Sequence, residues 1–591
     1  MATERERGPR VAGWELAVLA GALALGAALR WPALATPRYL DDHAQLAMIE
    51  GAWPLPRAGL DVFAFARRGE RAALVDTGLL PWWTDGRFSL SMGRPLASAL
   101  ARADHAVFGR GVRGPHVHSL VWWALAVSAA AVLLRAALPR RTAAVATVLY
   151  ALDAAHTLPV AWLANRSVLV ATFFGLVGTI AHVRWREQRR AHMAAVVTVA
   201  FGLSALAGEY AASSLAYVLA WELIVARDPA AVRLRACLPA VAPVALVFGT
   251  FRALGYGASG SGQYIDPLGQ PQAFALAAAG RMPALLADAV LARAADGASL
   301  VAAVVGNGPV VGVAALVALV GTLAVVTRAM DPALRRRIAW LLVGGVMALV
   351  PVLPSIPSSR LLVASGVGFA GALAVLVVGV LALPGAPRAQ GALAWAARGA
   401  CLLAAVLHLG VAPWRTWTEA RFVADFVRRD RAALVRSAPP AGTDRMVVLA
   451  AGDPETLHYP TLVWREEGLP VPARWAVLSM TPSPLLLVRL DANTLDLRSL
   501  GTPMLTTAME TMYRAPWRPL AVGQPVRGAG LVAEVMEREG GYPRQVRFRF
   551  DRDLDAPGTL VVVATANGLV PLRLPPVRGG TVIPPPGVPG L

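Results

Sequence analysis

The chain has 591 residues, of which 56% are hydrophobic and only 16% are charged, and its mean hydropathy is +0.53. An ordinary soluble chain carries about 25% charged residues, so this composition excludes one water-soluble core, and it also excludes disorder, which needs low hydrophobicity. The net charge is +19, and arginine supplies it because the chain contains no lysine. Cys237 and Cys401 lie in apolar runs, which predicts neither a disulfide framework nor a cysteine metal site. The sequence therefore predicts a polytopic α-helical membrane protein.

Apolar stretches long enough to cross the hydrocarbon core, about 20 residues each, recur along the first 411 residues. We expect about eleven transmembrane helices. In chain order they are Val11–Ala35, His116–Leu138, Thr142–Leu163, Ser167–Val183, Ala191–Ala207, Tyr210–Ala226, Ala236–Leu254, Ser299–Thr327, Ile338–Leu353, Leu361–Leu383 and Ala392–Val411. The first is too long for a cleaved signal peptide, and no small-residue cleavage site follows it.

Arginines precede the first predicted span and follow the second, fourth, sixth and eighth. They are Arg5, Arg7, Arg10, Arg135, Arg140, Arg141, Arg184, Arg186, Arg189, Arg190, Arg227, Arg233, Arg235, Arg328, Arg335, Arg336 and Arg337. This alternation is the positive-inside pattern and predicts a cytoplasmic N-terminus; an odd number of spans then places the C-terminus outside. We expect a protein of the bacterial inner membrane, with membrane lipid as a partner. The anchoring arginines account for the net charge, so no nucleic-acid partner is expected.

The predicted loops divide the chain into regions. A multi-span region covers 1–413 and includes an extracytoplasmic loop over 36–115. An amphipathic helix at Trp414–Arg436 and a linker fill 414–440. From 441 to 591 we expect a small, mainly β extracytoplasmic domain that ends in a proline-rich tail from Pro575. Its β-like runs are Met446–Leu449, Trp475–Leu478, Leu485–Leu490, Leu531–Val535, Val546–Phe550 and Thr559–Val563. Without a metal or nucleophile constellation, it reads as a recognition or packing module.

Short motifs on the predicted outer face follow one another in a fixed order. They are Asp41-Asp42 after the first span, Gly93-Arg94-Pro95-Leu96, Phe108-Gly109 before His116, Y-A-L-D-A-A-H-T-L-P-V-A over 150–161 followed by Trp162 and Asn165-Arg166, L-S-A-L-A-G-E over 203–209, and Ser359-Arg360-Leu361. In this order the chain, from residue 41 to about residue 430, resembles the GT-C membrane glycosyltransferases. It is most similar to the tetratricopeptide-containing transmembrane O-mannosyltransferases and their bacterial relatives.

The chain departs from that family at several positions. Asp153 stands where the family has the first histidine of a pair, Leu158 stands for a glutamate, Gly208 for a lysine and Ser119 for an asparagine. The tetratricopeptide repeats are absent, and the β-like region takes their place. These departures leave open a scaffold of the GT-C type that has lost catalysis and serves as an assembly partner.

The resemblance implies transfer of a sugar from a polyprenyl-phosphate-linked donor to an acceptor hydroxyl on the periplasmic face, with inversion. The acceptor would be a glycan, a lipid or a protein. Such a reaction needs a carboxylate base, for which Asp41 is the first candidate and Asp42 the alternate. Two adjacent carboxylates raise one pKa towards the range useful for proton transfer. The plain alternative is that the pair caps a helix over His43–Glu50.

The donor phosphate needs cationic groups. Arg166 and Arg360 lie on outer turns, where the positive-inside rule disfavours arginine, so they are phosphate candidates; snorkelling to lipid head groups is the alternative. Glu209 either supports Asp41 or forms an ion pair, and His156 either binds donor phosphate or sugar or packs in the bundle. Arg94 belongs to the candidate set, although anchoring a helix over 94–108 on the membrane surface is the stronger interpretation.

Neither a cofactor nor a metal is expected. Asp41, Asp42, Asp85 and Glu209 could hold a hard cation, but their spacing does not demand one, and the resembling enzymes act without metal. A transporter or lipid-handling membrane protein without catalysis is the alternative function. Transporters gather their charges near the bilayer midplane, whereas the charges here lie at one membrane face, which favours an enzyme.

Overall fold

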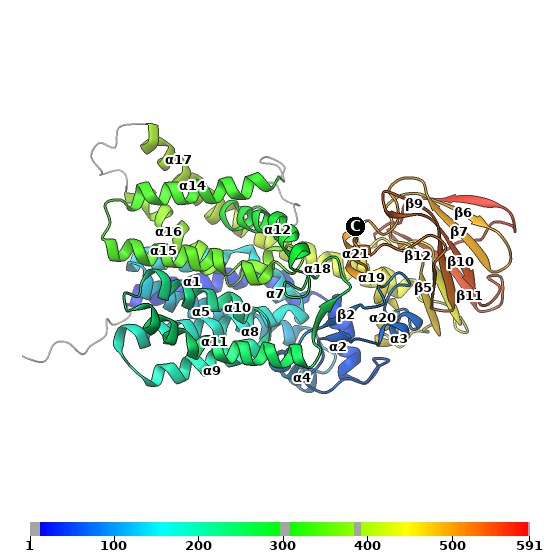
Figure 1. The fold of residues 1–591 in the computed structure, drawn as a ribbon, viewed down its shortest axis with the longest axis horizontal. Helices are drawn as coiled ribbons and strands as arrows, with labels where there is room; N and C mark the ends of the chain where they lie inside the picture. Colours follow the sequence, from blue (N-terminus) through cyan, green and yellow to red (C-terminus); the bar gives the residue numbers. More distant parts are fainter. Residues whose placement is uncertain (1–11, 296–307, 383–391, 589–591) are drawn as a thin grey trace, which may run out of the picture.

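The computed structural model describes residues 12–295, 308–382 and 392–588. Their long apolar runs form a bundle of helices, and a β-rich region follows towards the C-terminus (Figure 1). The helices of the bundle are α1 (Gly13–Leu29), α5 (Arg113–Ala137), α6 (Arg140–Leu152), α7 (Thr157–Ala161), α8 (Ser167–Gln188), α9 (His192–Ala207), α10 (Ala211–Ile224), α11 (Ala230–Ala253), α12 (Pro271–Leu291), α14 (Pro309–Thr327), α15 (Pro332–Met347), α16 (Gly366–Ala382) and α17 (Ala392–Val406).

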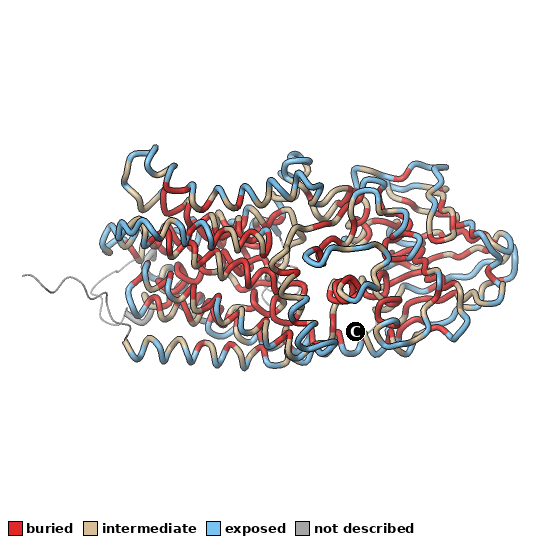
Figure 2. Tube along the Cα trace, turned by 90° about the horizontal axis from the view of Figure 1, so that it is seen from below, coloured by how far each residue is buried: buried red, intermediate tan, exposed pale blue. Residues whose placement is uncertain are grey.

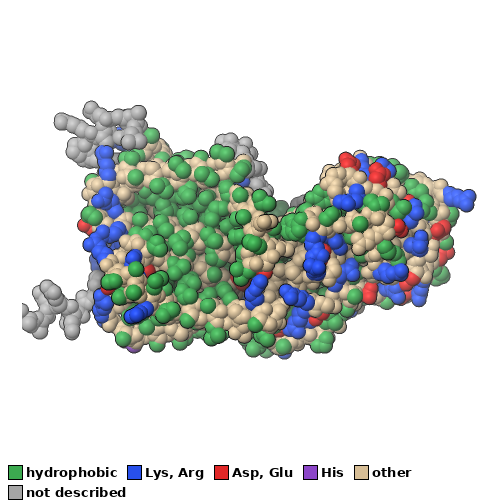
Figure 3. Space-filling view, in the orientation of Figure 1, with side chains coloured by type: hydrophobic (Ala, Val, Ile, Leu, Met, Phe, Trp, Pro, Cys, Tyr) green, Lys and Arg blue, Asp and Glu red, His purple; other side chains and the backbone are tan. Residues whose placement is uncertain are grey.

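The bundle presents an apolar surface, as Figure 3 shows, which suits lipid rather than water. Six helices in the described part of the chain are long and apolar enough to cross a membrane, or seven if one bent pair counts as a span, and four shorter apolar helices accompany them. The protein is therefore a polytopic helical membrane protein with a β-rich C-terminal region. The predicted number of eleven spans is not confirmed.

Two elements differ from the predicted spans. The stretch predicted as Thr142–Leu163 bends by 46° between α6 and the following short helices. The predicted spans leave 255–298 as a loop, but this stretch contains α12. Arg281 and Asp288 interrupt its apolar run, yet both are buried, and the Arg281 guanidinium donates to the carbonyl of Leu353 at 2.7 Å. Residues 299–307 of another predicted span lie outside the described residues.

The arginine-rich loops meet at one end of the bundle. Arg337, near the start of α15, donates to the carbonyl of Ala136 near the end of α5 and forms an ion pair with Glu187 near the end of α8 at 2.6 Å. Arg186 in α8 pairs with Asp228, in the loop after α10, at 2.6 Å. Alternate loops thus share one end of the bundle, as the positive-inside pattern requires; which side of the membrane they face remains a prediction.

Short elements cover the opposite end of the bundle, where the candidate residues lie. They are η1 (Trp31–Ala35), α2 (Asp41–Ile49), α3 (Arg71–Asp76), α4 (Pro95–Phe108), η2 (Ala154–His156), η3 (Leu163–Arg166), η4 (Val350–Val352) and η5 (Ser359–Leu362), with a three-stranded sheet of β1 (Ala64–Ala66), β2 (Ser89–Ser91) and β3 (Gly257–Ser259). Here α2 and α4 lie between the bundle and the C-terminal region (Figure 1).

One continuous helix runs from the bundle into the C-terminal region. α17 passes through a π-helical turn at Leu407–Val411 into α18 (Ala412–Arg436), so that the helix spans Trp395–Arg436. The amphipathic helix expected at Trp414–Arg436 is present, but it continues the last predicted span instead of following it as a separate element. One helix therefore connects the two parts of the chain.

The C-terminal region contains two sheets. A six-stranded antiparallel sheet has the order β13-β6-β7-β10-β9-β8, and a four-stranded sheet has the order β12-β11-β4-β5, in which β4 is parallel to both neighbours. The strands are β4 (Arg445–Val448), β5 (Arg474–Val477), β6 (Leu485–Arg489), β7 (Thr494–Ser499), β8 (Pro525–Gly528), β9 (Leu531–Glu539), β10 (Tyr542–Phe550), β11 (Thr559–Thr565), β12 (Gly568–Pro571) and β13 (Gly580–Ile583). The predicted proline-rich tail thus includes a strand, β13, that pairs with β6.

Helices also belong to this region. α19 (Pro454–His458) and α20 (Pro460–Glu466) connect the parallel strands β4 and β5, and α21 (Ala508–Tyr513) follows β7. The sequence pattern did not predict these helices. A crossover of this kind is what parallel strands require, because a tight hairpin joins only antiparallel ones.

The loop over 36–115 and the C-terminal region share a hydrophobic core. Trp82 and Trp83 are almost fully buried, and their indole N–H groups donate to the carbonyls of Leu478 at 3.0 Å and Glu510 at 3.2 Å. Figure 2 shows buried segments throughout both halves of the molecule. The division into domains at 413 and 441 remains a prediction.

Candidate active site

The N-terminus of α2 carries the paired aspartates. The residue at the N-cap position, just before the helix, is Leu40, which has φ +48° and makes no side-chain cap hydrogen bond, while Asp41 and Asp42 occupy the first turn. The helix thus starts two residues earlier than the expected His43–Glu50, and neither aspartate is its N-cap. Carboxylates in a first turn are stabilised by the N-terminal end of the helix dipole.

Asp41 faces the C-terminal region. Its Oδ1 accepts a hydrogen bond of 3.0 Å from the hydroxyl of Tyr459, and its side chain is half-buried. Burial raises the pKa of Asp41 above the ordinary value, and this shift is opposed by the Tyr459 hydrogen bond and the positive charges of Arg360 and Arg94. Burial thus favours the protonated carboxyl group, whereas the hydrogen bond and the two cations favour the ionised form that a base needs.

Arg360 lies on η5 near Asp41. Its Nη1 donates to Oδ1 of Asn165 at 3.2 Å, and its guanidinium carbon lies 5.0 Å from the ring centroid of Trp162. Within the described ranges no carboxylate lies within ion-pairing distance of this guanidinium. Arg360 is thus a positioned cation whose charge is not neutralised by a carboxylate.

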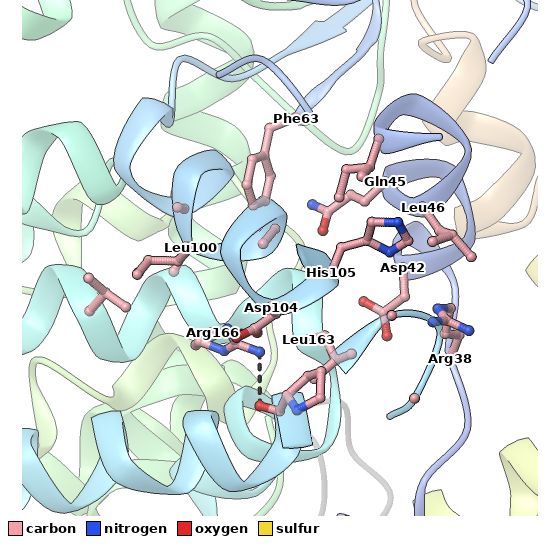
Figure 4. Close-up of a pocket in the computed structure, with 18 residues that line it drawn as sticks. Arg38, Asp42, Gln45, Leu46, Phe63, Leu100, Asp104, His105, Leu163 and Arg166 are labelled. Atoms are coloured by element: carbon pink, nitrogen blue, oxygen red, sulfur yellow. Dashed lines mark hydrogen bonds and ion pairs between the residues drawn. The ribbon is translucent and has the colours of Figure 1, made fainter. Parts of the chain in front are cut away.

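Asp42 points away from Asp41 into a different environment. Its two oxygens accept hydrogen bonds from the backbone N–H groups of Ala164 at 2.7 Å and Tyr39 at 3.2 Å. Burial raises the pKa of Asp42 to about 7. Its side chain lines a cavity of about 70 Å³ together with Gln45 and His105, which Figure 4 shows around it.

Arg166 lies at the far side of the same cavity (Figure 4). It is buried, it forms an ion pair with Asp104, and it donates to Oγ of Ser119 at 2.8 Å and to the carbonyl of Pro115 at 2.9 Å. Its donors are therefore engaged by the protein, in contrast to those of Arg360. Because the side chain is buried, it does not reach lipid head groups by snorkelling.

Arg94 and Glu209 form an ion pair. Arg94 precedes α4, and its Nη2 lies 2.7 Å from Oε2 of Glu209 in the turn before α10. The guanidinium also lies 5.0 Å from the ring centroid of Phe63, and Nη1 donates to Oγ of Ser167 at 3.3 Å. The ion pair that was the alternative role of Glu209 is thus present, and it leaves Arg94 close enough to act on the charge of Asp41.

His156 belongs to a separate environment. It is fully buried, its ring packs edge-on against Tyr150 with centroids 4.6 Å apart, and its Nδ1 lies 3.3 Å from the carbonyl oxygen of Asp153. Its Nε2 has no hydrogen-bond partner among the described residues. The position matches the packing alternative, since no donor phosphate or sugar could reach a fully buried ring without a rearrangement.

The predicted candidates thus fall into three groups. Arg360 and Arg94 act on the charge of Asp41, and Glu209 pairs with Arg94; Asp42 and Arg166 line the cavity; His156 packs in the bundle. Among the described residues no group of three metal-ligating side chains is arranged to hold a metal ion. The absence of a metal from the reaction therefore stays a prediction.

Tyr459 is the contact that the sequence pattern missed. A signal for its location exists in Asp453-Pro454-Glu455, because an N-cap aspartate followed by proline indicates the start of a helix. A helix between two β-like runs indicates parallel strands, and ligand sites of such units lie beyond the carboxyl ends of the strands. The sequence alone gives no reason to place this segment against Asp41.

Comparisons with known proteins give limited similarity. No protein-family model matches the chain, and no curated protein matches it. An Archaeoglobus fulgidus oligosaccharyltransferase, solved with a tethered acceptor peptide, is similar with a TM-score of 0.40 and 13% identity over 79% of this chain. The similar part is 64% of the length of that archaeal protein.

Two bacterial structures are similar to the same degree. ArnT from Cupriavidus metallidurans, solved with bound undecaprenyl phosphate, has a TM-score of 0.41 and 12% identity over 77% of this chain and 85% of its own. The mycobacterial arabinofuranosyltransferase AftD has a TM-score of 0.40 and 15% identity over 92% of this chain and 42% of its own. These TM-scores and identities are too low to establish a common fold.

Proposed function

We propose that the chain is a membrane glycosyltransferase that moves a sugar from a polyprenyl-phosphate-linked donor to an acceptor hydroxyl. The observation that carries the proposal is the placement of Asp41 beside Arg360, a guanidinium that lacks a carboxylate partner among the described residues. Together they offer a base and an anion-binding cation at one site, at the end of an apolar bundle. A lipid-linked donor fits this position because its chain stays in the membrane while its phosphate reaches the site.

The chemistry assigns a role to each group. Asp41 takes the proton of the acceptor hydroxyl while the oxygen of that hydroxyl attacks the anomeric carbon of the donor sugar. The bond between that carbon and the phosphate oxygen breaks, and polyprenyl phosphate leaves with the bonding electron pair. Arg360 stabilises the charge that develops on the phosphate, and Arg94, held by Glu209, adds to the positive potential. Direct displacement inverts the anomeric configuration.

The location follows from the arginine-rich loops. With those loops in the cytoplasm, the site and the C-terminal region lie on the periplasmic side of a bacterial inner membrane. The acceptor, whether glycan, lipid or protein, would approach from there. Arg166 and His156 are not assigned to the donor, because the protein itself engages the donors of Arg166 and His156 is fully buried.

The test is transfer from a panel of radiolabelled polyprenyl-phosphate sugars by purified protein in detergent, with Asp41→Asn alongside. We expect one donor to turn over, and the Asp41→Asn protein to lose that turnover by about 100-fold or more while still binding the donor. Asp266→Asn is the matched control, because Asp266, in the loop after α11, pairs with the exposed Arg252 in the last turn of that helix. It should keep the wild-type rate.

Two outcomes would contradict the proposal. Full turnover in Asp41→Asn would show that Asp41 is not the base. Donor binding without turnover of any sugar by the wild type would favour the alternative, a lipid-handling protein on a related scaffold that has lost catalysis. That alternative is supported by the positions at which the chain departs from the family motifs. At one of them, Asp153, the carboxylate accepts a 2.8 Å hydrogen bond from the N–H of Ala155.

A further inference from the structure

The segment that contacts Asp41 belongs to the β-rich region and not to the bundle. α19 and α20 form the crossover between the parallel strands β4 and β5, and Asp453 caps α19 by accepting a 2.8 Å hydrogen bond from the N–H of Thr456. Such a crossover begins at the carboxyl end of a strand, the usual place of functional side chains in parallel sheets. The four-stranded sheet therefore fixes the position of this segment.

Three side chains of the segment hold the beginning of α2. Oε1 of Glu455 accepts a 2.6 Å hydrogen bond from the N–H of Leu40, and the Tyr459 hydroxyl donates to Asp41 at 3.0 Å. Oε1 of Glu466 lies 2.7 Å from Nδ1 of His43. Leu40, Asp41 and His43 at this helix start are thus tied to the C-terminal region.

The backbone at Leu40 adds to this observation. A φ of +48° is rare for a residue with a branched side chain and is retained where surrounding contacts demand it. The hydrogen bond to Glu455 is a contact of this kind, because it fixes the direction of the Leu40 N–H. The geometry of the first turn of α2, and with it the direction of the Asp41 carboxylate, depends on the docked segment.

We infer that Tyr459 is a positioning residue of the proposed transfer reaction: supplied by the C-terminal region, it orients the Asp41 carboxylate and keeps it ionised. This inference rests on the proposed function for its link to catalysis. It assigns the C-terminal region a part in the catalytic centre, beyond the recognition or packing role that the sequence suggests.

The direction of the effect follows from the hydrogen bond. A donor to a carboxylate stabilises its charged form, so loss of the Tyr459 hydroxyl raises the pKa of Asp41 further. Burial raises the pKa of Tyr459 well above its ordinary value, so the hydroxyl remains a donor throughout the physiological range. The other charged and titratable groups that act on Asp41 or feel its charge are Arg360, Arg94, Asp42 and Tyr513.

The experiment measures the protonation of Asp41 without relying on turnover. Dicyclohexylcarbodiimide modifies protonated carboxyl groups, and fragment-ion mass spectrometry, which distinguishes Asp41 from its neighbour Asp42, gives the labelling of Asp41 as a function of pH. In Tyr459→Phe we expect the labelling midpoint to move up by about one pH unit, the shift expected for one hydrogen bond to a charged group. The acidic limb of the transfer rate should move by the same amount, with the KM for the donor unchanged.

Two controls separate this role from docking and from loss of any nearby hydroxyl. Glu466→Gln weakens a neighbouring contact of the same helix with α2 but leaves the Tyr459 hydroxyl in place. Tyr513→Phe removes a hydroxyl from a ring that packs against His458, with centroids 4.8 Å apart. Both variants should keep the wild-type labelling midpoint.

The results that overturn the inference are distinct from those that overturn the proposed function. An unchanged labelling midpoint in Tyr459→Phe, or an equal shift in Glu466→Gln, would show that Tyr459 acts through packing alone. A shifted midpoint in a protein that transfers no sugar would retain the effect of Tyr459 on the ionisation of Asp41 but would remove the proposed reaction, and the positioning role with it.

Discussion

Asp41 and Asp42 are neighbours in sequence, but their carboxylates have different partners. Asp42 accepts two backbone N–H hydrogen bonds, from Ala164 and Tyr39, and thereby joins α2 to η3 and to the chain before it. Asp41 has one partner among the described residues, the Tyr459 hydroxyl, and faces cations. A structural role therefore suits Asp42, and a chemical role suits Asp41.

The first prediction separates these roles. Asp42→Asn leaves one of the two backbone N–H groups facing an amide NH₂, so we expect the free energy of unfolding to fall by about 1–3 kcal/mol. Thermal unfolding measures the loss, and the transfer rate per folded molecule should remain near that of the wild type. A folded Asp42→Asn protein without activity would instead indicate that Asp42 is the base.

The second prediction concerns the phosphate. Arg360→Ala removes an unneutralised guanidinium, so the affinity for a polyprenyl-phosphate donor should fall about 10- to 100-fold, the worth of a charge-assisted hydrogen bond. Binding of a labelled donor by the purified protein checks this. The matched control is Arg252→Ala, whose guanidinium is exposed and paired with Asp266. Equal donor affinity in Arg360→Ala and in the wild type would contradict the assignment.

At the scale of elements, η5 owes its position to the packing of α16, which follows it. α16 approaches α15 closely because glycines meet there: a Cβ on Gly368 would lie 2.1 Å from the carbonyl oxygen of Leu341 and 2.9 Å from Cα of Gly345. Neither neighbour is a flexible side chain that could give way. Close helix packing through small residues is typical of membrane bundles.

The third prediction tests this contact. Gly368→Ala should force α15 and α16 apart and lower the free energy of unfolding by about 1–3 kcal/mol. Because η5 precedes α16, donor binding by Arg360 should weaken as well. Gly321→Ala in α14 is the control, since its Cβ would meet nothing within 4 Å. Thermal unfolding of both variants in detergent decides; equal stability would show that the contact tolerates a methyl group.

Sequence patterns predicted the elements with strong periodicity and missed those that depend on contacts across the chain. α8 and α9 lie close to their predicted spans because a helix is the stable structure in lipid for a single apolar run of that length. α12 escaped prediction because its burial of Arg281 relies on the carbonyl of Leu353 in another element. No local sequence pattern indicates such a partner.

The candidate site shows the same division. The outer-face motifs predicted Asp41 and Arg360 as members of one site; in the structure the charge of Arg360 acts on Asp41, and their roles stay predictions. The motifs could not predict the ion pair of Arg166 with Asp104, because these residues lie 62 positions apart in the sequence and only the folded chain brings them together. Nor could they place Tyr459, which lies more than four hundred residues after Asp41.

At the scale of the whole molecule, buried carboxyl groups lie where α2 meets the C-terminal region. Burial raises the pKa of Asp453 to about 6 and that of Glu455 well above its ordinary value. Oε2 of Glu455 is buried without a hydrogen-bond partner among the described residues. Docking of the two parts therefore favours protonated carboxyl groups at this contact.

The fourth prediction follows from the sign of these shifts. Between the unfolded and the folded pKa values the folded state binds more protons, so the free energy of unfolding falls as pH rises, by up to about 1.4 kcal/mol per pH unit for each group. We expect unfolding, followed by tryptophan fluorescence, to require less denaturant at pH 8 than at pH 5.

Glu455→Gln tests the origin of that slope. Glutamine resembles the protonated acid in shape and keeps an oxygen that can accept from the N–H of Leu40. The variant should match or exceed the wild type in stability at pH 8 and should show a flatter dependence on pH. Glu539→Gln, at an exposed site on β9, should retain the full slope. If Glu455→Gln retains it too, the protonation that couples the C-terminal region to α2 belongs to groups other than Glu455.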